Sequence, residues 1–408
     1  MGFADVSNSE APALLLRVGL AVLVCLFSVA GSFVGELALA AGPADSGVLE
    51  FTASERAQID AMGPWPPPVK RDASNRVEGQ ALAIEFGRAL FGDTRLSRDG
   101  KRSCASCHRP DLAFQDGRAV AVGLAPGVRN TPTLLDSGQL RWLGWDGGHD
   151  SLWWASLEPM LDKREMGHSL ASLASTVRSV PAWTVQYRQV FGVGLPADNK
   201  RLAIDIAKAL AAYGATLVSP RTAFDDFRDA LTAGDTNAAA SYPIDAQRGL
   251  RLFAGEAGCT SCHSGARFSN GEFADIGIPF FIPGGVDAGR HSGLKTLMNN
   301  ELNRLGLFND AVETDSRALL TRHIYIDHRH FGEFKVPSLR QLTHTAPYMH
   351  NGSLNTLEEV VKHYNNIDLD RLHADGARLL RPLSLDAAEL ADLVAFLRSL
   401  SSQGLTAE

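Results

Sequence analysis

Two short motifs in the sequence combine thiols with an imidazole at a fixed spacing. They read Cys104-Ala105-Ser106-Cys107-His108 and Cys259-Thr260-Ser261-Cys262-His263. Two thiols three positions apart can each form a thioether with one vinyl group of a haem, and the histidine that follows can bind the iron. A redox-active cysteine pair or a zinc site is the alternative for a single motif. Two copies in one chain favour two covalently bound haems c.

The beginning of the chain has the pattern of an export signal. Arg17 precedes an apolar run from Val18 to Val34, and Ala38-Leu39-Ala40 has the small residues that signal peptidase prefers. Residues 1–40 are therefore predicted to be a signal peptide, with an uncleaved membrane anchor as the alternative. Without Cys25, the remaining cysteines all belong to the two motifs. We expect a periplasmic protein with no stable membrane span after signal removal.

Composition limits the class of protein. The chain has 408 residues, of which 45% are hydrophobic and 21% charged, and its formal net charge is -7. This length suits two domains of ordinary size, and the balance is that of a globular protein. The negative charge argues against nucleic acid as a partner, because phosphate binding requires a basic surface.

The two motifs lie in similar local contexts. Gly87-Arg88-Ala89-Leu90-Phe91-Gly92 precedes the first, and Gly249-Leu250-Arg251-Leu252-Phe253-Ala254 precedes the second. Both have a helical apolar pattern, which indicates an internal duplication. We predict an all-α fold of two cytochrome c-like haem domains that arose by duplication, with long irregular loops.

The end of the chain predicts the closing helix of the second domain. Leu390, Leu393, Val394, Leu397 and Leu400 form an apolar stripe at helical spacing, and Asp386 with Glu389 forms a capping box. The predicted organisation is an extended segment at 41–74, an N-terminal peroxidatic domain at 75–217, a linker at 218–243 and a C-terminal electron-transfer domain at 244–408.

From about Gly87 to Leu400 the chain resembles the bacterial di-haem cytochrome c peroxidase family, and within it the MauG-like branch. Besides the two motifs, the resemblance is carried by Asp93-Thr94-Arg95-Leu96-Ser97, Arg129-Asn130-Thr131-Pro132, Gly144-Trp145-Asp146-Gly147, Pro159 to Met166, Phe334-Lys335-Val336-Pro337-Ser338-Leu339-Arg340, Thr345-Ala346-Pro347-Tyr348-Met349-His350-Asn351-Gly352 and Thr356-Leu357-Glu358-Glu359.

The resemblance implies that the haem held by His108 reacts with hydrogen peroxide. The peroxidase branch has a histidine beyond the first motif that can bind the open coordination position of this iron. Residues Ala119 to Val128 contain no histidine, which predicts a five-coordinate iron in the resting enzyme. Glu165 and Pro159 match the family's catalytic glutamate and its neighbouring proline. A lone glutamate is otherwise a surface charge. Ala155 replaces the family's glutamine, which alters the hydrogen bonds expected around peroxide.

The resemblance also assigns residues to the second haem. Tyr364 stands where the peroxidase branch has its methionine ligand, as in MauG-like proteins. A tyrosine packed on the haem edge, or Met349 or His363 as the ligand, is the alternative. Trp145 matches the tryptophan that bridges the two haems.

Two further sets of residues are candidates for binding roles. Asn130, Thr345 and Pro347 match the family's calcium ligands, and oxygen ligands suit Ca²⁺. Arg340 and Arg290 are candidates for contacts with haem propionates. The His328-Arg329-His330 cluster is a candidate metal site, with a solvated loop as the alternative.

Two functions from different classes follow. The first is an enzyme that reduces hydrogen peroxide and draws electrons from a small periplasmic donor, a cytochrome c or cupredoxin, or from aromatic side chains of a protein substrate. Tyr364 and the missing histidine favour the protein substrate. The second is a non-enzymatic di-haem electron carrier with both irons closed.

Overall fold

The computed structural model describes residues 47–370, 376 and 379–405. The predicted signal peptide lies outside these residues. What is described belongs to one compact unit that begins at Asp45. Within it, no helix is both long enough and apolar enough to cross a bilayer.

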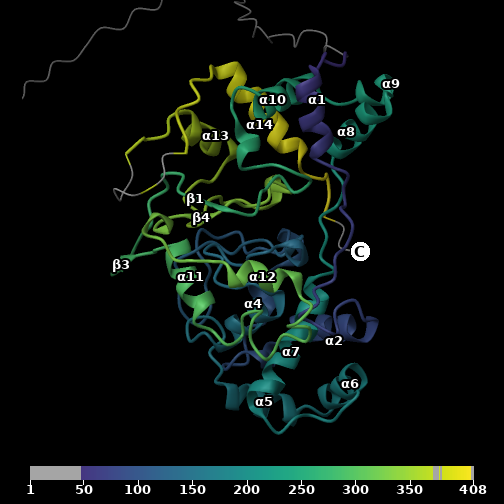
Figure 1. The fold of residues 1–408 in the computed structure, drawn as a ribbon, viewed down its shortest axis with the longest axis vertical. Coiled ribbons are helices and arrows are strands. Elements are labelled where there is room, and N and C mark those ends of the chain that lie inside the picture. Colours follow the sequence, from purple (N-terminus) through teal and green to yellow (C-terminus); the bar gives the residue numbers. More distant parts are fainter. Residues whose placement is uncertain (1–46, 371–375, 377–378, 406–408) are drawn as a thin grey trace, which may run out of the picture. The chain divides into compact units, whose positions relative to one another are not determined.

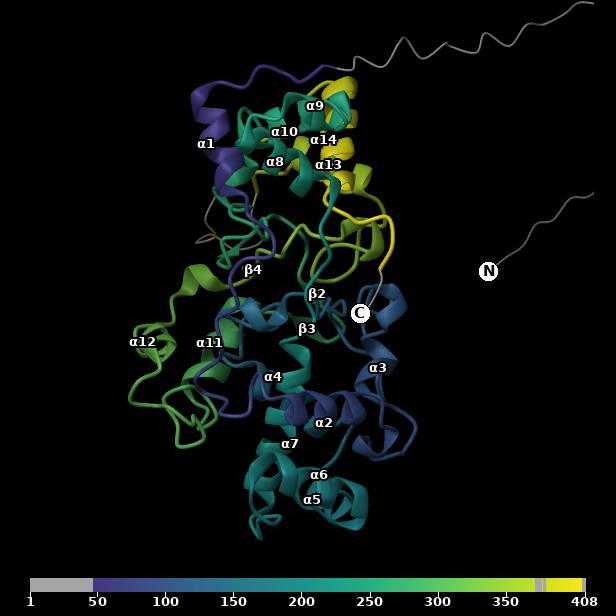
Figure 2. The same ribbon diagram turned by 90° about the vertical axis from the view of Figure 1, so that its right-hand side faces the viewer.

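Helices dominate this unit, and strands are short. The helices, labelled in Figures 1 and 2, are α1 (Ala53–Ala61), α2 (Ala81–Phe91), α3 (Cys104–Cys107), α4 (Leu152–Leu161), α5 (Leu170–Ser179), α6 (Pro181–Phe191), α7 (Asn199–Gly214), α8 (Ala223–Ala233), α9 (Thr236–Ala239), α10 (Ile244–Ala254), α11 (Arg290–Met298), α12 (Ser316–Arg322), α13 (Leu357–Asn365) and α14 (Ala387–Ser399). The strands β1 (Phe273–Ala274) and β4 (Phe334–Lys335) pair antiparallel, as do β2 (Phe281–Ile282) and β3 (Gly285–Val286). The predicted all-α class with long irregular loops is confirmed.

Two hydrophobic cores organise the chain. The first gathers α2, α4, α5, α6 and α7, and its largest buried side chains include Trp153, Trp154 and Tyr187. The second gathers α1, α8, α10, α13 and α14 around Phe224, Phe253 and Phe396. Figures 1 and 2 both show these two groups of helices at opposite ends of the unit.

The same helix crossing is found in each core. Helix α2 packs on α7, and α10 packs on α14. At the crossing points, a methyl group on Gly87 would overlap the carbonyl oxygen of Ala209, and one on Gly249 would overlap that of Asp392. A glycine at the equivalent position lets both pairs of backbones approach closely. The predicted capping box is also present, since Asp386 accepts from the backbone of Glu389 at 2.9 Å at the start of α14.

Two segments that the sequence predicted as an extended stretch and a linker contain helices. The range 41–74, predicted as extended, contains α1, and the predicted linker 218–243 contains α8 and α9. Both α1 and α8 contribute side chains to the second core. The exact domain boundaries stay a prediction.

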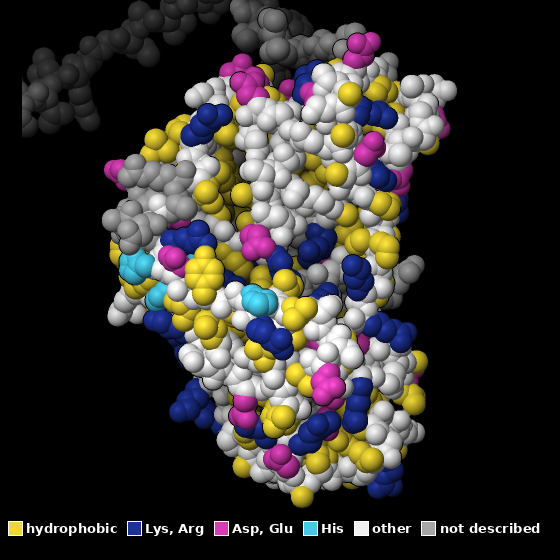
Figure 3. All heavy atoms as spheres, viewed as in Figure 1, with side chains coloured by type: hydrophobic (Ala, Val, Ile, Leu, Met, Phe, Trp, Pro, Cys, Tyr) yellow, Lys and Arg dark blue, Asp and Glu magenta, His cyan; other side chains and the backbone are white. Residues whose placement is uncertain are grey.

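The long segment that carries α11 and α12 follows the second motif in sequence but packs on the first core, through Leu297 and Phe308. Its outer side exposes apolar side chains, among them Leu307, Leu319 and Tyr325. Figure 3 shows apolar, histidine and basic side chains side by side over this region. The segment therefore connects the two halves and gives the unit a mixed apolar and basic surface.

Candidate haem sites

The first motif lies on a short helix that presents both thiols. Helix α3 spans Cys104–Cys107, and the backbone N–H of Ser103 donates to Ser106 Oγ at 3.0 Å. His108 follows directly and donates from Nδ1 to the carbonyl of Phe114 at 3.0 Å. Because a carbonyl can only accept, Nδ1 carries the proton and Nε2 is the nitrogen available to iron. Desolvation lowers the pKa of His108, although the Phe114 carbonyl opposes this shift, so the imidazole stays neutral as a ligand must.

The second motif repeats this arrangement. Residues Cys259–Ser261 form a 3₁₀ turn, and His263 Nδ1 donates to the carbonyl of Phe268 at 2.8 Å. Phe114 and Phe268 both have positive φ, 58° and 52°. Desolvation also lowers the pKa of His263. The hydrogen bond that orients the histidine is thus the same in both halves.

The four thiols fit thioether attachment better than the alternatives. All four are free of disulfides. Desolvation raises the pKa of Cys104 and of Cys259 to about 12, whereas redox-active cysteines require a stabilised thiolate. Across the described part of the chain, no group of three or more His, Cys, Asp or Glu residues could hold a metal ion, the cluster around His328 included. These observations favour haem at both motifs.

Glu165 lies close to the first motif. Its negative charge contributes to the raised pKa of both Cys104 and Cys107. The Glu165 side chain is exposed at the surface. Its pKa is nevertheless raised to about 7, first by desolvation from the surrounding protein and then by the charges of Asp162 and Glu158. A group with this pKa exchanges protons readily at neutral pH.

Pro159 and Glu165 are brought together by one loop. Pro159 lies inside α4, and its carbonyl accepts from the backbone of Met166 at 3.1 Å. On the other side, Leu124 donates to the carbonyl of Glu165 at 3.0 Å. A side chain at Gly123 would clash with the backbone of Glu165. The stretch that lacks the family's histidine therefore supports the glutamate.

The surroundings of Ala155 include a contact between two rings that the sequence did not predict. It is partly buried on α4 beside Trp153 and Trp154, which are both fully buried. Trp154 Nε1 and His149 Nε2 have no hydrogen-bond partner in the part of the chain that the structure describes, and their two rings meet edge to face with centroids 4.7 Å apart. Such a pair cannot be found from spacing alone, because it joins a loop to a helix.

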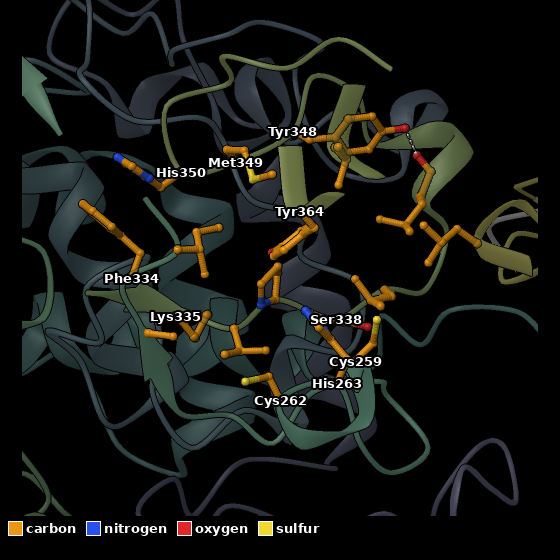
Figure 4. Close-up of a pocket in the computed structure, with 18 of the residues that line it drawn as sticks. Cys259, Cys262, His263, Phe334, Lys335, Ser338, Tyr348, Met349, His350 and Tyr364 are labelled. Carbon is orange, nitrogen blue, oxygen red and sulfur yellow. Dashed lines mark hydrogen bonds between the residues drawn. The ribbon is translucent and has the colours of Figure 1, made fainter. Parts of the chain in front are cut away.

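A cavity of about 260 Å³ lies over the second motif. Figure 4 shows His263, Cys259 and Cys262 on its wall together with Tyr364 and Met349. Tyr364 comes from α13 and is partly buried, and desolvation raises its pKa. His363 is turned away, since its Nε2 is 2.8 Å from the carbonyl of Ile276. Of the candidate ligands, Tyr364 and Met349 line the cavity.

The residues matched to the tryptophan bridge and to calcium lie on the same cavity wall. Trp145 Nε1 donates to the carbonyl of Asn130 at 2.9 Å. Among the described residues, no hydrogen bond uses Asn130 Oδ1 or the carbonyls of Thr345 and Pro347. All four residues line the cavity. The three candidate calcium ligands thus come from segments that are far apart in sequence, and all three residues line this one cavity.

The two arginines considered for propionates are engaged elsewhere. Arg340 donates to both carboxylate oxygens of Asp225, at 3.0 and 2.6 Å. Arg290 lies 4.0 Å over the Phe273 ring and donates to the carbonyl of Gly147 at 2.8 Å. Neither arrangement was foreseen from the sequence.

Comparison with known proteins agrees with this geometry. A model of the family described as di-haem cytochrome c peroxidase matches residues 81–233. The methylamine utilization protein MauG of Methylorubrum extorquens is 35% identical over 340 residues, which cover 83% of this chain and 83% of that protein. The chain belongs to the di-haem cytochrome c peroxidase family.

Other relatives carry both kinds of name found in this family. The cytochrome-c peroxidase IdrP1 of Denitromonas iodatirespirans is 34% identical over 357 residues, 85% of this chain and 87% of that protein. The crystal structure of a MauG-like protein associated with microbial copper homeostasis superposes with a TM-score of 0.61 at 26% identity, over 84% of this chain and 97% of the other. This di-haem peroxidase is accordingly an oxidoreductase that uses peroxide and carries two haems c.

Proposed function

We propose that the His108 half reduces hydrogen peroxide and that the His263 half supplies the electrons. Haem iron supplies the redox chemistry when it is bound. The observation that carries this assignment is Glu165, which lies beside the first motif and has its pKa raised to about 7. The loop 119–128, which contacts its backbone, contains no histidine. The second motif instead faces Tyr364 across its cavity.

Glu165 serves as the acid–base group in this proposal. Its carboxylate takes one proton from peroxide and returns it to the oxygen that leaves as water. Two electrons from the His263 half and two protons then reduce the remaining oxygen to a second water. The charges of Asp162 and Glu158 favour the protonated form and so bring the pKa close to neutral pH. Pro159 holds the loop that carries the glutamate.

Tyr364 is proposed as the second ligand of the His263 haem. Desolvation raises the pKa of its hydroxyl, so the phenolate forms only when a positive metal ion takes the place of the proton. A hard anionic ligand stabilises oxidised iron more than a thioether does. Trp145, bonded to Asn130 on one side of the cavity, is proposed as the relay between the two halves.

Calcium is proposed to bind Asn130 Oδ1 and the carbonyls of Thr345 and Pro347. The three residues line one cavity, and these oxygens accept no hydrogen bond from any described residue. Oxygen ligands completed by water are the coordination that Ca²⁺ prefers.

The reducing partner is proposed to be a protein outside the cytoplasm. The predicted signal at residues 1–40 supports export to the periplasm. A small cytochrome c or cupredoxin is one candidate, and a protein oxidised on its aromatic side chains is the other. The combination of Tyr364 with a histidine-free loop favours the second, because it resembles the MauG-like branch.

The resting ferric spectrum of the purified protein tests this assignment. We expect a mixture of high-spin and low-spin haem, with the low-spin component altered by Tyr364→Phe and unaltered by the neighbouring His363→Gln. Two low-spin haems that do not react with one equivalent of peroxide would instead identify a simple electron carrier. An unchanged spectrum in Tyr364→Phe would remove Tyr364 as the ligand.

A further inference from the structure

The cavity of the second half contains positive charge that its own residues do not neutralise. Four basic side chains line it: Arg267, Lys335, Arg340 and Arg381. Arg340 is paired with Asp225, and Arg381 is exposed to solvent. Arg267 and Lys335 form no ion pair with any described residue.

One carboxylate, Asp136, is found among the described residues of the cavity wall. It is buried and accepts hydrogen bonds from the backbone and the hydroxyl of Ser219, at 2.9 and 2.8 Å. It makes no hydrogen bond to either unpaired cation. Its charge favours the protonated form of Arg267, but desolvation outweighs this effect and lowers the pKa of the guanidinium.

Both cations are short of hydrogen-bond partners. Lys335 is only 9% exposed, and its ammonium makes one long contact, 3.5 Å to the carbonyl of Trp142. Desolvation lowers its pKa to about 8, and the charge of Arg267 adds to this shift. Arg267 Nη1 is enclosed and has no hydrogen-bond partner among the residues that the structure describes. Lys335 is buried and Arg267 is half-buried. Two neighbouring cations with unused donors in such surroundings are unfavourable unless an anion joins them.

We propose that Arg267 and Lys335 bind the two propionates of the haem attached at Cys259 and Cys262. This inference rests on the proposed position of the second haem. A haem c brings two carboxylates, which matches two unpaired cations in charge. Guanidinium and ammonium groups both form strong charge-assisted hydrogen bonds with carboxylates. The two residues are positioning residues, since they act on the haem edge and not on peroxide.

The pairing also sets the electron affinity of this haem. A cation near the porphyrin stabilises the reduced state, which carries one positive charge less, and this effect is strong where water is excluded. Removing one cation also leaves a propionate charge unopposed, which favours the oxidised state further. Both contributions lower the reduction potential of the second haem.

Reduction potentials of the full holoprotein test the proposal. We expect Lys335→Met and Arg267→Gln each to lower the reduction equilibrium constant of the low-spin haem about tenfold, a shift of about 59 mV for one electron. Lys335→Arg and Arg267→Lys keep the charge and should retain most of the wild-type potential. Arg381→Gln is the matched control, because it removes the same charge from an exposed position on the same cavity.

The outcomes separate this inference from the assignment of the haem itself. Intact mass first establishes that each variant carries two haems. Wild-type potentials in both Lys335→Met and Arg267→Gln, or an equal shift in Arg381→Gln, would overturn the inference alone. Loss of the second haem in the charge-removing variants, but not in the charge-keeping ones, would support it. A wild-type protein without a low-spin haem would contradict the proposed function instead.

Discussion

The two halves of the molecule share the helix crossing and the hydrogen bond that orients the histidine of each motif. They differ in the further side chain that lies near each motif. In both, a glycine on the first helix meets the carbonyl of the last helix, and the histidine donates to a phenylalanine carbonyl. Glu165, on the loop after α4, lies near the first motif, and Tyr364, on α13, lines the cavity beside the second.

This comparison separates what the fold requires from what the chemistry requires. The repeated contacts hold helices together and orient an imidazole, so they serve both halves equally. In the proposed function, the Glu165 carboxylate transfers a proton between the two oxygens of peroxide, whereas the Tyr364 phenol offers an oxygen to a metal ion. One duplicated unit can therefore serve two tasks through changes confined to the segments that follow each motif.

Replacing each motif histidine by alanine, one at a time, should give the largest effects and tests whether the two haems have different roles. His108→Ala should abolish the reaction with peroxide while the low-spin haem stays attached. His263→Ala should remove the low-spin signal and leave the first haem able to react. Rapid mixing with peroxide, followed by absorbance, distinguishes the two. A His108→Ala protein that reacts at the wild-type rate would contradict the assignment.

Replacing Glu165 should produce the next largest effect. Glu165→Gln removes the acid–base group, and a loss of about 10²- to 10⁴-fold in the rate with peroxide is expected. In the wild type the rate should rise with pH through about 7, because the carboxylate must be deprotonated to accept a proton and its pKa is raised to that range. The glutamine variant should lose this inflection.

Glu158→Gln provides the control for that experiment. Glu158 is exposed, and its charge contributes to the raised pKa of Glu165. Its removal should shift the inflection to lower pH and leave the limiting rate nearly unchanged. An inflection that persists in Glu165→Gln would assign the titration to another group.

The sequence predicted the parts of this fold that depend on neighbours along the chain. The cysteine motifs, the helix before each of them and the capping box at Asp386 involve residues a few positions apart, so their spacing is visible in one dimension. Helix α1 was missed because its role is to bury Ile59 in the second core, a contact made across the fold.

The same limit explains what was missed around the sites. Arg340 appeared free for a propionate, but Asp225 lies 115 positions earlier in the chain and takes its guanidinium. Lys335 belongs to the family-like segment 334–340, but its position in the sequence does not show that its side chain is buried. Charge compensation depends on which residues meet in space, and so the cations that matter emerged only from the structure.

The smallest expected effect concerns the shared scaffold. Gly87→Ala and Gly249→Ala each place a methyl group against a carbonyl of the facing helix, with Tyr213 Cβ at 2.9 Å and Phe396 Cβ at 2.8 Å respectively. Overpacking of this kind costs about 1–3 kcal/mol, partly offset by about 1 kcal/mol of helix propensity gained by alanine. Thermal unfolding followed at each haem's absorbance should report a lower midpoint in the half that carries the change.

Gly92→Ala is the matched control, since this glycine has φ −89° and no atom within 4 Å of an added methyl group. It should leave both midpoints within about 1 °C of the wild type, because a surface change without new contacts alters stability little. If Gly87→Ala and Gly249→Ala behave like this control, close helix approach is not what the two halves have in common. If they destabilise both halves equally, the halves unfold as one unit, which would agree with the packing of the segment of α11 and α12 on the first core although it follows the second motif in sequence.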